Sequence, residues 1–408
     1  MAGPVFFILI AVEVFVGYRR GTSYYRLNDA VNDISTGLLM QLSQLFTKVL
    51  VVGGYVFVYE RFAVGDYSGN HVGTWIVCFL GVDCAYYWFH RLSHEINFLW
   101  AAHVVHHQSE DYNLAVALRQ STLQPIFGAV FYWPLAVVGF SPVVFVTCSS
   151  FNTLYQFWLH TRVVGKLGPI EEIFVTPSHH RVHHGRNPIY LDRNHGGTFI
   201  LWDRLFGTFE REGEEVVYGI TTPLRSWNPV WANLHYWVEL FQTAFATKRP
   251  IDKLRTFVAA PGWFPEDLGG RVSPPEVSSA TRKFDRDYPK GLGSYAVFQF
   301  GLLIVVTILL GVVGAEQTLA AQLGWVGLVV WGLVNLGGLF EVRSWSYYSE
   351  GARVVAASLL PFVLLSGDSR GWAVGLFALG LLSFGFRMLG LREVYRATDD
   401  DGMDAASL

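Results

Sequence analysis

The sequence predicts an all-α, polytopic membrane protein. Of its 408 residues, 51% are hydrophobic and only 15% are charged, whereas an average soluble domain is about 25% charged. Several apolar runs approach the roughly 20 residues that a membrane-spanning helix needs. Aromatic residues make up 16% of the chain, and Trp and Tyr are enriched where spanning helices meet the membrane–water interface. Together these observations predict a chain that crosses a membrane several times.

Residues 1–150 are predicted to form N-terminal transmembrane helices. The first apolar run ends at Arg19 and Arg20 and lacks a positive leading segment and a small-residue cleavage site, so we expect an uncleaved span. Pro134 and Pro142 interrupt the fourth run. Because proline breaks the helical hydrogen-bond ladder, a re-entrant hairpin or two short helices are expected there. The four runs are Gly3–Tyr18, Ile34–Tyr59, Val72–Phe89 and Gln124–Ser149.

Residues 151–250 are predicted to form a water-facing helical cap. They contain no clean apolar span, and turn-forming stretches such as GKLGP, HHGRNP and NHGGT interrupt them. Within them, Asn228–Phe245 is amphipathic and aromatic, which is typical of a helix lying in the membrane interface. Residues 251–290 are expected to be a linker.

Residues 291–395 are predicted to form C-terminal transmembrane helices. They contain no histidine, so we expect any chemistry to belong to the first 250 residues. These helices either pack around the catalytic half or form the face of a homodimer, and the sequence leaves both open. Residues 396–408 are polar and are expected to be disordered. The four C-terminal runs are Tyr295–Ala315, Leu319–Phe340, Val354–Leu365 and Gly371–Leu389.

The distribution of charge indicates an orientation and excludes one class of partner. The net charge is −3 and no basic patch occurs, so we expect no nucleic-acid binding. Arg19, Arg20 and Arg26 follow the first run, and an arginine-rich stretch extends from Arg181 to Arg211. Because positive charge near span ends favours the cytoplasmic side, we expect the cap to be cytosolic.

Histidine is the residue that points to chemistry. Ten of the 13 histidines lie between His90 and His184. Residues at positions i, i+3 and i+4 share one face of a helix, so we expect each of three short motifs to present two or three imidazoles toward one point. The motifs are HRLSH with His90 and His94, HVVHH with His103, His106 and His107, and HRVHH with His180, His183 and His184.

These motifs predict a dinuclear metal site. Neutral imidazole suits Zn, Cu, Fe and Ni, and eight imidazoles are too many for one metal ion. Because HRLSH closes an apolar run, we expect the metal site just beyond the cytoplasmic end of the spanning helices. The full expectation is therefore transmembrane helices with a cytosolic, histidine-rich helical cap that holds two metals.

Other polar residues near the motifs are further candidates. His160 is alone in sequence and is expected to be a ligand, whereas His179 adjoins His180 on a different helix face. His195 is expected next to the ligands, with a direct metal contact left open. Glu95 follows His94 and is a ligand, an acid that orients an imidazole, or a solvated acid. HExxH, the pattern of zinc proteases, does not occur.

The motifs resemble those of the fatty acid hydroxylase and sterol desaturase superfamily, whose pattern is HxxxH, HxxHH, an isolated histidine and HxxHH. Longer stretches, including QSEDYNLAVALRQS and HHRVHHGRNPIYLDRN, are similar to its alkylglycerol monooxygenase branch. The resemblance covers roughly residues 85–265. One departure is His195, where that branch usually has a tyrosine.

The resemblance implies the identity of the metals and the roles of single residues. It implies a di-iron centre bound by the eight motif histidines together with His160 and His179. Glu95 matches an acid of that branch and is a candidate catalytic residue. Asn113 and Arg119, which lie in the stretch EDYNLAVALRQ, are candidates for contact with a lipid headgroup or a cofactor.

The resemblance also implies a reaction. It implies an O2-dependent monooxygenase that hydroxylates a lipid at the ether carbon of a glyceryl alkyl ether, giving a fatty aldehyde and a glycerol derivative. Tetrahydrobiopterin or another external reductant, or an electron-donor protein, would supply electrons. One alternative is a sterol, fatty-acyl or aminolipid hydroxylase or desaturase of the same superfamily. A more distant alternative is a metal transporter, which the placement of the histidines at span ends disfavours.

Overall fold

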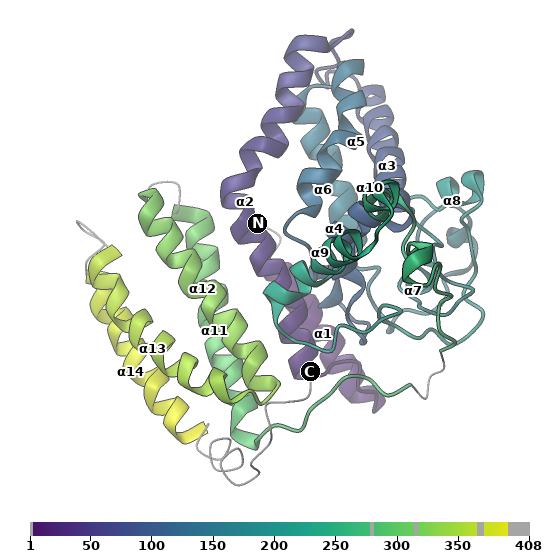
Figure 1. The fold of residues 1–408 in the computed structure, drawn as a ribbon. Coiled ribbons are helices and arrows are strands. Elements are labelled where there is room, and N and C mark those ends of the chain that lie inside the picture. Colours follow the sequence, from purple (N-terminus) through teal and green to yellow (C-terminus); the bar gives the residue numbers. More distant parts are fainter. Residues whose placement is uncertain (1–2, 278–280, 314–316, 365–370, 391–408) are drawn as a thin grey trace. The chain divides into compact units, whose positions relative to one another are not determined.

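The computed structural model describes residues 3–277, 281–313, 317–364 and 371–390 (Figure 1). Within these ranges the regular structure is helical and no strand occurs, which confirms the all-α prediction. The described residues divide into two compact units. The first comprises the described residues up to Leu224 and Asn233–Lys283, and the second comprises Arg225–Ala232 and the described residues from Phe284 onward. The domain boundaries expected at residues 150, 250, 290 and 395 stay predictions, and the tail 396–408 lies outside the described residues.

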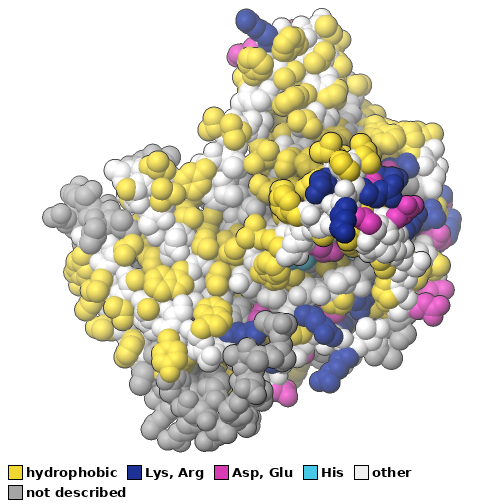
Figure 2. All heavy atoms as spheres, in the orientation of Figure 1, with side chains coloured by type: hydrophobic (Ala, Val, Ile, Leu, Met, Phe, Trp, Pro, Cys, Tyr) yellow, Lys and Arg dark blue, Asp and Glu magenta, His cyan; other side chains and the backbone are white. Residues whose placement is uncertain are grey.

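Long apolar helices make up the part of the first unit that precedes the cap. Helices α2 and α3 pack against α5, and α3 also packs against α6. The exposed face of these helices is mainly hydrophobic (Figure 2), as expected of side chains that face lipid. The helices are α1 (Gly3–Arg20), α2 (Leu27–Phe62), α3 (Val72–Glu95), α5 (Gln124–Val138) and α6 (Pro142–Phe157).

Four of the described helices are long and apolar enough to cross a membrane: Leu27–Phe62, Val72–Glu95, Gly291–Val312 and Leu319–Phe340. The chain is therefore a multi-pass membrane protein by length and composition. Helix α1 forms where the first span was expected but is not among the four. It carries the charged residues Glu13, Arg19 and Arg20 within 18 residues.

The run Gln124–Ser149 forms two short helices, which confirms one of the two expected arrangements. The break lies at Gly139, and Pro134 stays inside α5. Gly139 ends α5 in the left-handed conformation with φ of 110°, where a Cβ atom would lie 2.1 Å from the carbonyl oxygen of Gly65. Only glycine fits so close an approach. Ser141 then caps α6 by accepting a hydrogen bond from the N–H of Val144.

The rest of the first unit consists of helices joined by loops, and the longest of these helices, α9, has its first residues, up to Ala232, in the second unit. The predicted interfacial helix Asn228–Phe245 corresponds to α9, and its place in the membrane interface stays a prediction. The elements are α4 (Asn97–His107), η1 (Val116–Leu118), η2 (Gly168–Glu172), α7 (Pro177–His183), α8 (Leu201–Phe206), α9 (Pro229–Ala246), α10 (Pro250–Val258) and η3 (Glu266–Leu268).

In the described part of the second unit, four helices form a bundle, and the sequence of this unit contains no histidine. Its interior holds an ion pair between Arg353 and the fully buried Glu350. Tyr295 donates a hydrogen bond to the same carboxylate, so this buried charge is paired and hydrogen-bonded as burial requires. The helices are α11 (Lys290–Val313), α12 (Leu319–Phe340), α13 (Ser344–Leu364) and α14 (Gly371–Gly390).

Candidate metal centre

A sharp corner between α3 and α4 brings the first two histidine motifs face to face. Ile96 ends α3 and directly precedes α4, and its backbone is extended, with φ of −125° and ψ of 119°. As a result, the His90 ring centroid lies 4.9 Å from that of His103. The His94 ring centroid lies 4.7 Å from that of His107. Two motifs that are separate in sequence therefore form one surface.

The third motif lies on α7, a helix of seven residues that begins at Pro177. Proline is favoured at this first position because its missing N–H would have no helical partner. Thr176 and His179 form a reciprocal capping box: the Thr176 side chain accepts from the N–H of His179, and His179 Nδ1 accepts from the N–H of Thr176. The caps satisfy the first N–H groups, which lets so short a helix hold its ligands in place.

Nine histidines converge into two groups, and all nine are buried. Within each group the candidate ligand nitrogens lie within 4.8 Å of one another. The groups adjoin each other, because the rings of His107 and His184 stack with centroids 4.4 Å apart. The five-histidine group is His90, His94, His103, His107 and His183, and the four-histidine group is His106, His160, His180 and His184.

Each HxxHH motif divides between the two groups: two of its imidazoles converge on one group, within the expected two or three, and the third joins the other group. His103 and His107, at i and i+4, belong to the five-histidine group, while His106 belongs to the other. In the third motif His180 and His184 stay together and His183 crosses over. A step of three residues and a step of four point about 100° apart on a helix with 3.6 residues per turn. The rings at i+3 and i+4 therefore point toward two different groups that lie side by side.

Backbone and amide oxygens orient several of the rings by holding one ring nitrogen. His90 Nδ1 lies 2.8 Å from the carbonyl oxygen of His195, and His106 Nδ1 lies 2.8 Å from that of Arg119. His183 Nδ1 lies 2.9 Å from the carbonyl oxygen of Arg193. A ring that donates from Nδ1 keeps Nε2 as a lone-pair donor for a metal.

The free ring nitrogens could hold a metal ion. The Nε2 atoms of His90, His94, His183 and His184 are buried and make no hydrogen bond. A buried polar atom without a partner is costly, and an ion within each group would satisfy these atoms. Burial is also the largest of the causes that lower the pKa of His106 to about 4. Burial therefore keeps this imidazole neutral, the form that binds metals.

Three residues that hold the site were not identified from the sequence. Gln124 Oε1 lies 2.9 Å from Nδ1 of His103. Asp203 accepts from the N–H groups of His195 (2.7 Å) and Gly196 (2.8 Å). Asp83 lies on α3 and accepts four hydrogen bonds, two of them from backbone N–H groups at Thr198 and Phe199. A lone acid inside an apolar run was a signal available for Asp83.

The three candidate catalytic residues lie outside both groups. The Glu95 side chain is 39% exposed and pairs with Arg91, with Oε1 and Nε 2.8 Å apart. Asn113 is buried, and its amide donates to the carbonyl oxygen of Tyr24 at 2.8 Å. Arg119 is 2% exposed. Its guanidinium donates inward to the side chains of Asn32, Asp33 and Gln108 and to the carbonyl oxygen of Val105.

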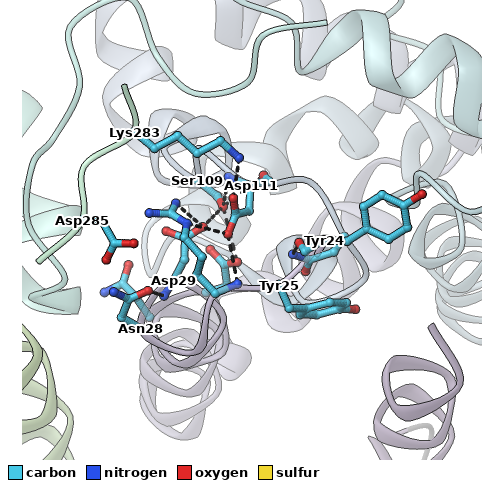
Figure 3. Close-up of polar contacts among 12 residues, drawn as sticks. Tyr24, Tyr25, Asn28, Asp29, Ser109, Asp111, Lys283 and Asp285 are labelled. Carbon is cyan, nitrogen blue, oxygen red and sulfur yellow. Dashed lines mark hydrogen bonds and ion pairs between the residues drawn. The ribbon is translucent and has the colours of Figure 1, made fainter. Parts of the chain in front are cut away.

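A polar network at the start of α2 holds the segment between the second motif and Arg119 (Figure 3). Ser109 donates to Asp29 at 2.6 Å. Asp111 pairs with Arg26 at 3.0 Å and with Lys283 at 2.6 Å. The network fixes the chain that follows His106 and His107 against a spanning helix, which limits the movement of these two rings.

Two further histidines lie near the groups without belonging to them. His179 has its Nδ1 atom in the cap of α7 and its ring against Phe209, with centroids 5.6 Å apart. The His195 ring lies 5.0 Å from that of His94 and 5.6 Å from those of His90 and His183. The resemblance implied that His179 binds metal, but its ring lies outside both groups. His195, which was expected next to the ligands, has its ring against three histidines of the five-histidine group.

The chain is similar to known lipid-oxidising enzymes. The fatty acid hydroxylase family model matches residues 75–208. Alkylglycerol monooxygenase of Homo sapiens is 42% identical over 306 residues, which cover 74% of this chain and 68% of that protein. Alkylglycerol monooxygenase of Danio rerio is 38% identical over 368 residues, 88% of this chain and 81% of that protein. Ornithine lipid hydroxylase OlsE of Rhizobium tropici is 32% identical over 124 residues, 30% of this chain and 38% of that protein. No solved structure matches the chain. The chain therefore belongs to the fatty acid hydroxylase family and, within it, to the alkylglycerol monooxygenases.

Proposed function

We propose that this protein is an O2-dependent lipid monooxygenase that hydroxylates the ether carbon of a glyceryl alkyl ether. The observation that carries the proposal is the pair of adjoining, buried groups of five and four histidines in a chain whose relatives are named alkylglycerol monooxygenases. The proposed reaction needs a centre that accepts electrons, handles O2 and excludes bulk water, and the two buried groups have the donors for such a centre.

Two iron ions are the proposed occupants of the two groups. Both groups consist of imidazoles alone, a donor set that suits iron, copper, zinc and nickel. Zinc has no redox chemistry, which leaves iron and copper as metals that react with O2, and the likeness of the histidine motifs to those of the fatty acid hydroxylase superfamily favours iron. When bound, the two iron ions would supply the activation of O2.

The remaining chemistry follows from the substrate. O2, two electrons and two protons convert the ether carbon and its hydrogen into a hydroxylated carbon and one water. The product at that carbon is a hemiacetal, which loses its alkoxy group and leaves a fatty aldehyde and a glycerol derivative. The protein's part is to hold the ligand rings, exclude water and align the alkyl chain.

Electrons are proposed to come from tetrahydrobiopterin or another external reductant, with an electron-donor protein as the other source. Glu95 is proposed to contact this reductant, because its side chain is partly exposed and it follows directly after His94. Arg119 and Asn113 hold the segment that follows the second motif. The proposed orientation places the cap on the cytoplasmic side, and a homodimer through the C-terminal helices stays a proposal.

An assay of aldehyde release tests this function. Purified protein supplied with an alkylglycerol, O2 and tetrahydrobiopterin should release fatty aldehyde and contain about two iron ions per chain. His107→Ala and His183→Ala should lose turnover while still inserting into the membrane. His71→Ala, at the exposed start of α3, is the control and should keep activity. A chain with one metal or none, or an active His107→Ala variant, would contradict the proposal.

An aminolipid is the second candidate substrate, favoured by the 32% identity to ornithine lipid hydroxylase OlsE over 30% of this chain. The same assay separates the two candidates. A hydroxylated aminolipid without any released aldehyde would favour the second.

A further inference from the structure

His195 is a buried imidazole whose ring nitrogens have no partner. The residue is fully buried, and neither Nδ1 nor Nε2 makes a hydrogen bond. Its ring lies against the rings of His90, His94 and His183, three members of the five-histidine group. An imidazole carries a donor or a lone pair on each nitrogen, so a ring buried in this way needs a partner, and the five-histidine group lies beside it.

The loop that carries His195 is rigidly constructed. Asp192 and Asn194 both have the left-handed conformation, with φ of 57° and 56°. A non-glycine residue keeps this conformation only where its surroundings enforce it. The enforcing contacts include the carboxylate of Asp203, which accepts from the N–H groups of His195 and Gly196. The ring position of His195 is therefore set by the fold.

The same loop already serves the five-histidine group through its backbone. The carbonyl oxygen of His195 holds His90 Nδ1 at 2.8 Å, and that of Arg193 holds His183 Nδ1 at 2.9 Å. A loop that orients two ligands by its carbonyl groups thus brings a third imidazole, with free nitrogens, to the same group. The four-histidine group has no equivalent, since His195 makes no ring contact with any of its members among the described residues.

We propose that His195 supplies a sixth imidazole to the metal of the five-histidine group. Six ligands fill the octahedral positions of iron, whereas sites that react with O2 keep positions open. The metal of the five-histidine group is then closed to small molecules. The metal of the four-histidine group, with four imidazoles, keeps open positions and is the one that binds them. This inference rests on the two metals of the proposed function and adds an asymmetry between them.

Nitric oxide counts the irons that have an open coordination position, because it binds ferrous iron only where such a position is free and is expected at one molecule per iron. Full-length protein in detergent is loaded anaerobically with ferrous iron and titrated with nitric oxide while the nitrosyl absorption and electron paramagnetic resonance signals are recorded. Wild type should bind one nitric oxide per chain. His195→Phe, which keeps a ring but has no nitrogen, should bind two.

A chelator challenge gives an independent readout. In His195→Phe, one of the two irons should be lost to a chelator at least about 10- to 100-fold faster, the range seen when groups supporting a metal ligand are removed. His235→Phe is the matched control, because His235 lies on α9 outside both groups, and it should behave like wild type. His195→Gln tests the same point with a polar side chain if the phenylalanine variant does not fold.

The outcomes distinguish a failure of the sixth-ligand proposal from a failure of the proposed function. Two nitric oxide molecules per wild-type chain, or one in both wild type and His195→Phe with unchanged loss of iron, would overturn the sixth-ligand proposal while the proposed function stands. A wild-type chain that does not hold two iron ions would overturn the proposed function and this inference together.

Discussion

We expect that replacing the Arg181 side chain loosens the candidate metal centre although every histidine of the two groups is kept. On α7 this side chain forms a two-pronged ion pair with Glu212, with both N–O distances at 2.7 Å. It also donates to the carbonyl oxygens of Thr161 at 3.0 Å and Val164 at 2.8 Å. Because Thr161 directly follows His160, Arg181 ties α7 to the segment that carries a ligand of the four-histidine group.

Arg181→Met keeps an apolar stem but removes all of these hydrogen bonds. The ion pair is largely buried, with side-chain exposures of 9% and 18%, and removal of one partner from a buried pair costs about 3–5 kcal/mol. Domain stabilities are about 5–15 kcal/mol, so we expect the chain to stay folded while α7 opens more often. Since about 1.4 kcal/mol is a factor of ten, amide exchange over residues 177–184 should accelerate by roughly two to three and a half orders of magnitude.

Hydrogen–deuterium exchange with mass spectrometry on the metal-free protein in detergent measures this acceleration. Arg211→Met is the control, because Arg211 pairs with Glu172 at the surface, where the side-chain exposures are 69% and 51%. Exposed pairs contribute about 0–1 kcal/mol, so exchange in α7 should change by less than about tenfold. Equal exchange of α7 in the two variants would refute the assignment of Arg181 as the clamp of this helix.

Three other perturbations have defined outcomes. Gln124→Leu removes the oxygen that holds His103 and should weaken the affinity of one metal by about 10- to 100-fold in a chelator titration; unchanged affinity would contradict this role. Asp83→Asn turns one acceptor oxygen into a donor facing N–H groups and should lower the free energy of unfolding by about 3 kcal/mol or more, seen as a lower thermal midpoint than wild type. Burial raises the pKa of Glu212, but the hydrogen bond and charge of Arg181 outweigh burial, and the net pKa lies below 4.5. The stabilisation is therefore present above pH 4.5 and lost as the pH falls through the folded-state pKa, so the difference in thermal midpoint between wild type and Glu212→Gln should shrink over that range. A constant difference would exclude this ionisation as its source.

The histidine spacing predicted the metal-binding groups but not how each motif divides. An i, i+3, i+4 pattern places three rings on one side of a helix, and the convergence of His103, His106 and His107 in one region follows from that. Which of the three joins which group depends on the rings that face them from other helices. His183 contacts the α3 rings and His180 contacts His160, and these contacts bring the neighbouring rings of α4 into different groups.

Local sequence allowed two short helices over residues 124–149, and of the two prolines expected to interrupt the run Pro142 opens α6 whereas Pro134 does not interrupt α5. Pro134 lies within α5, and the helix ends at Gly139. A Cβ atom on Gly139 would lie 2.1 Å from the carbonyl oxygen of Gly65. That close approach involves Gly65, which lies far away in sequence, so no local pattern around Gly139 signals it.

The sequence by itself determined the helical class and the chemical type of the site. In lipid the backbone must satisfy its own hydrogen bonds, so long apolar runs become helices, and clustered imidazoles bind soft or borderline metals. Only the tertiary structure decided what holds the rings and where the other polar residues point. The oxygens that orient His90, His106 and His183 are main-chain carbonyl groups, which every residue has and no residue type signals. Arg119 points inward, and His195 reaches the five-histidine group, for the same reason: the direction of a side chain is set by the distant elements packed around it.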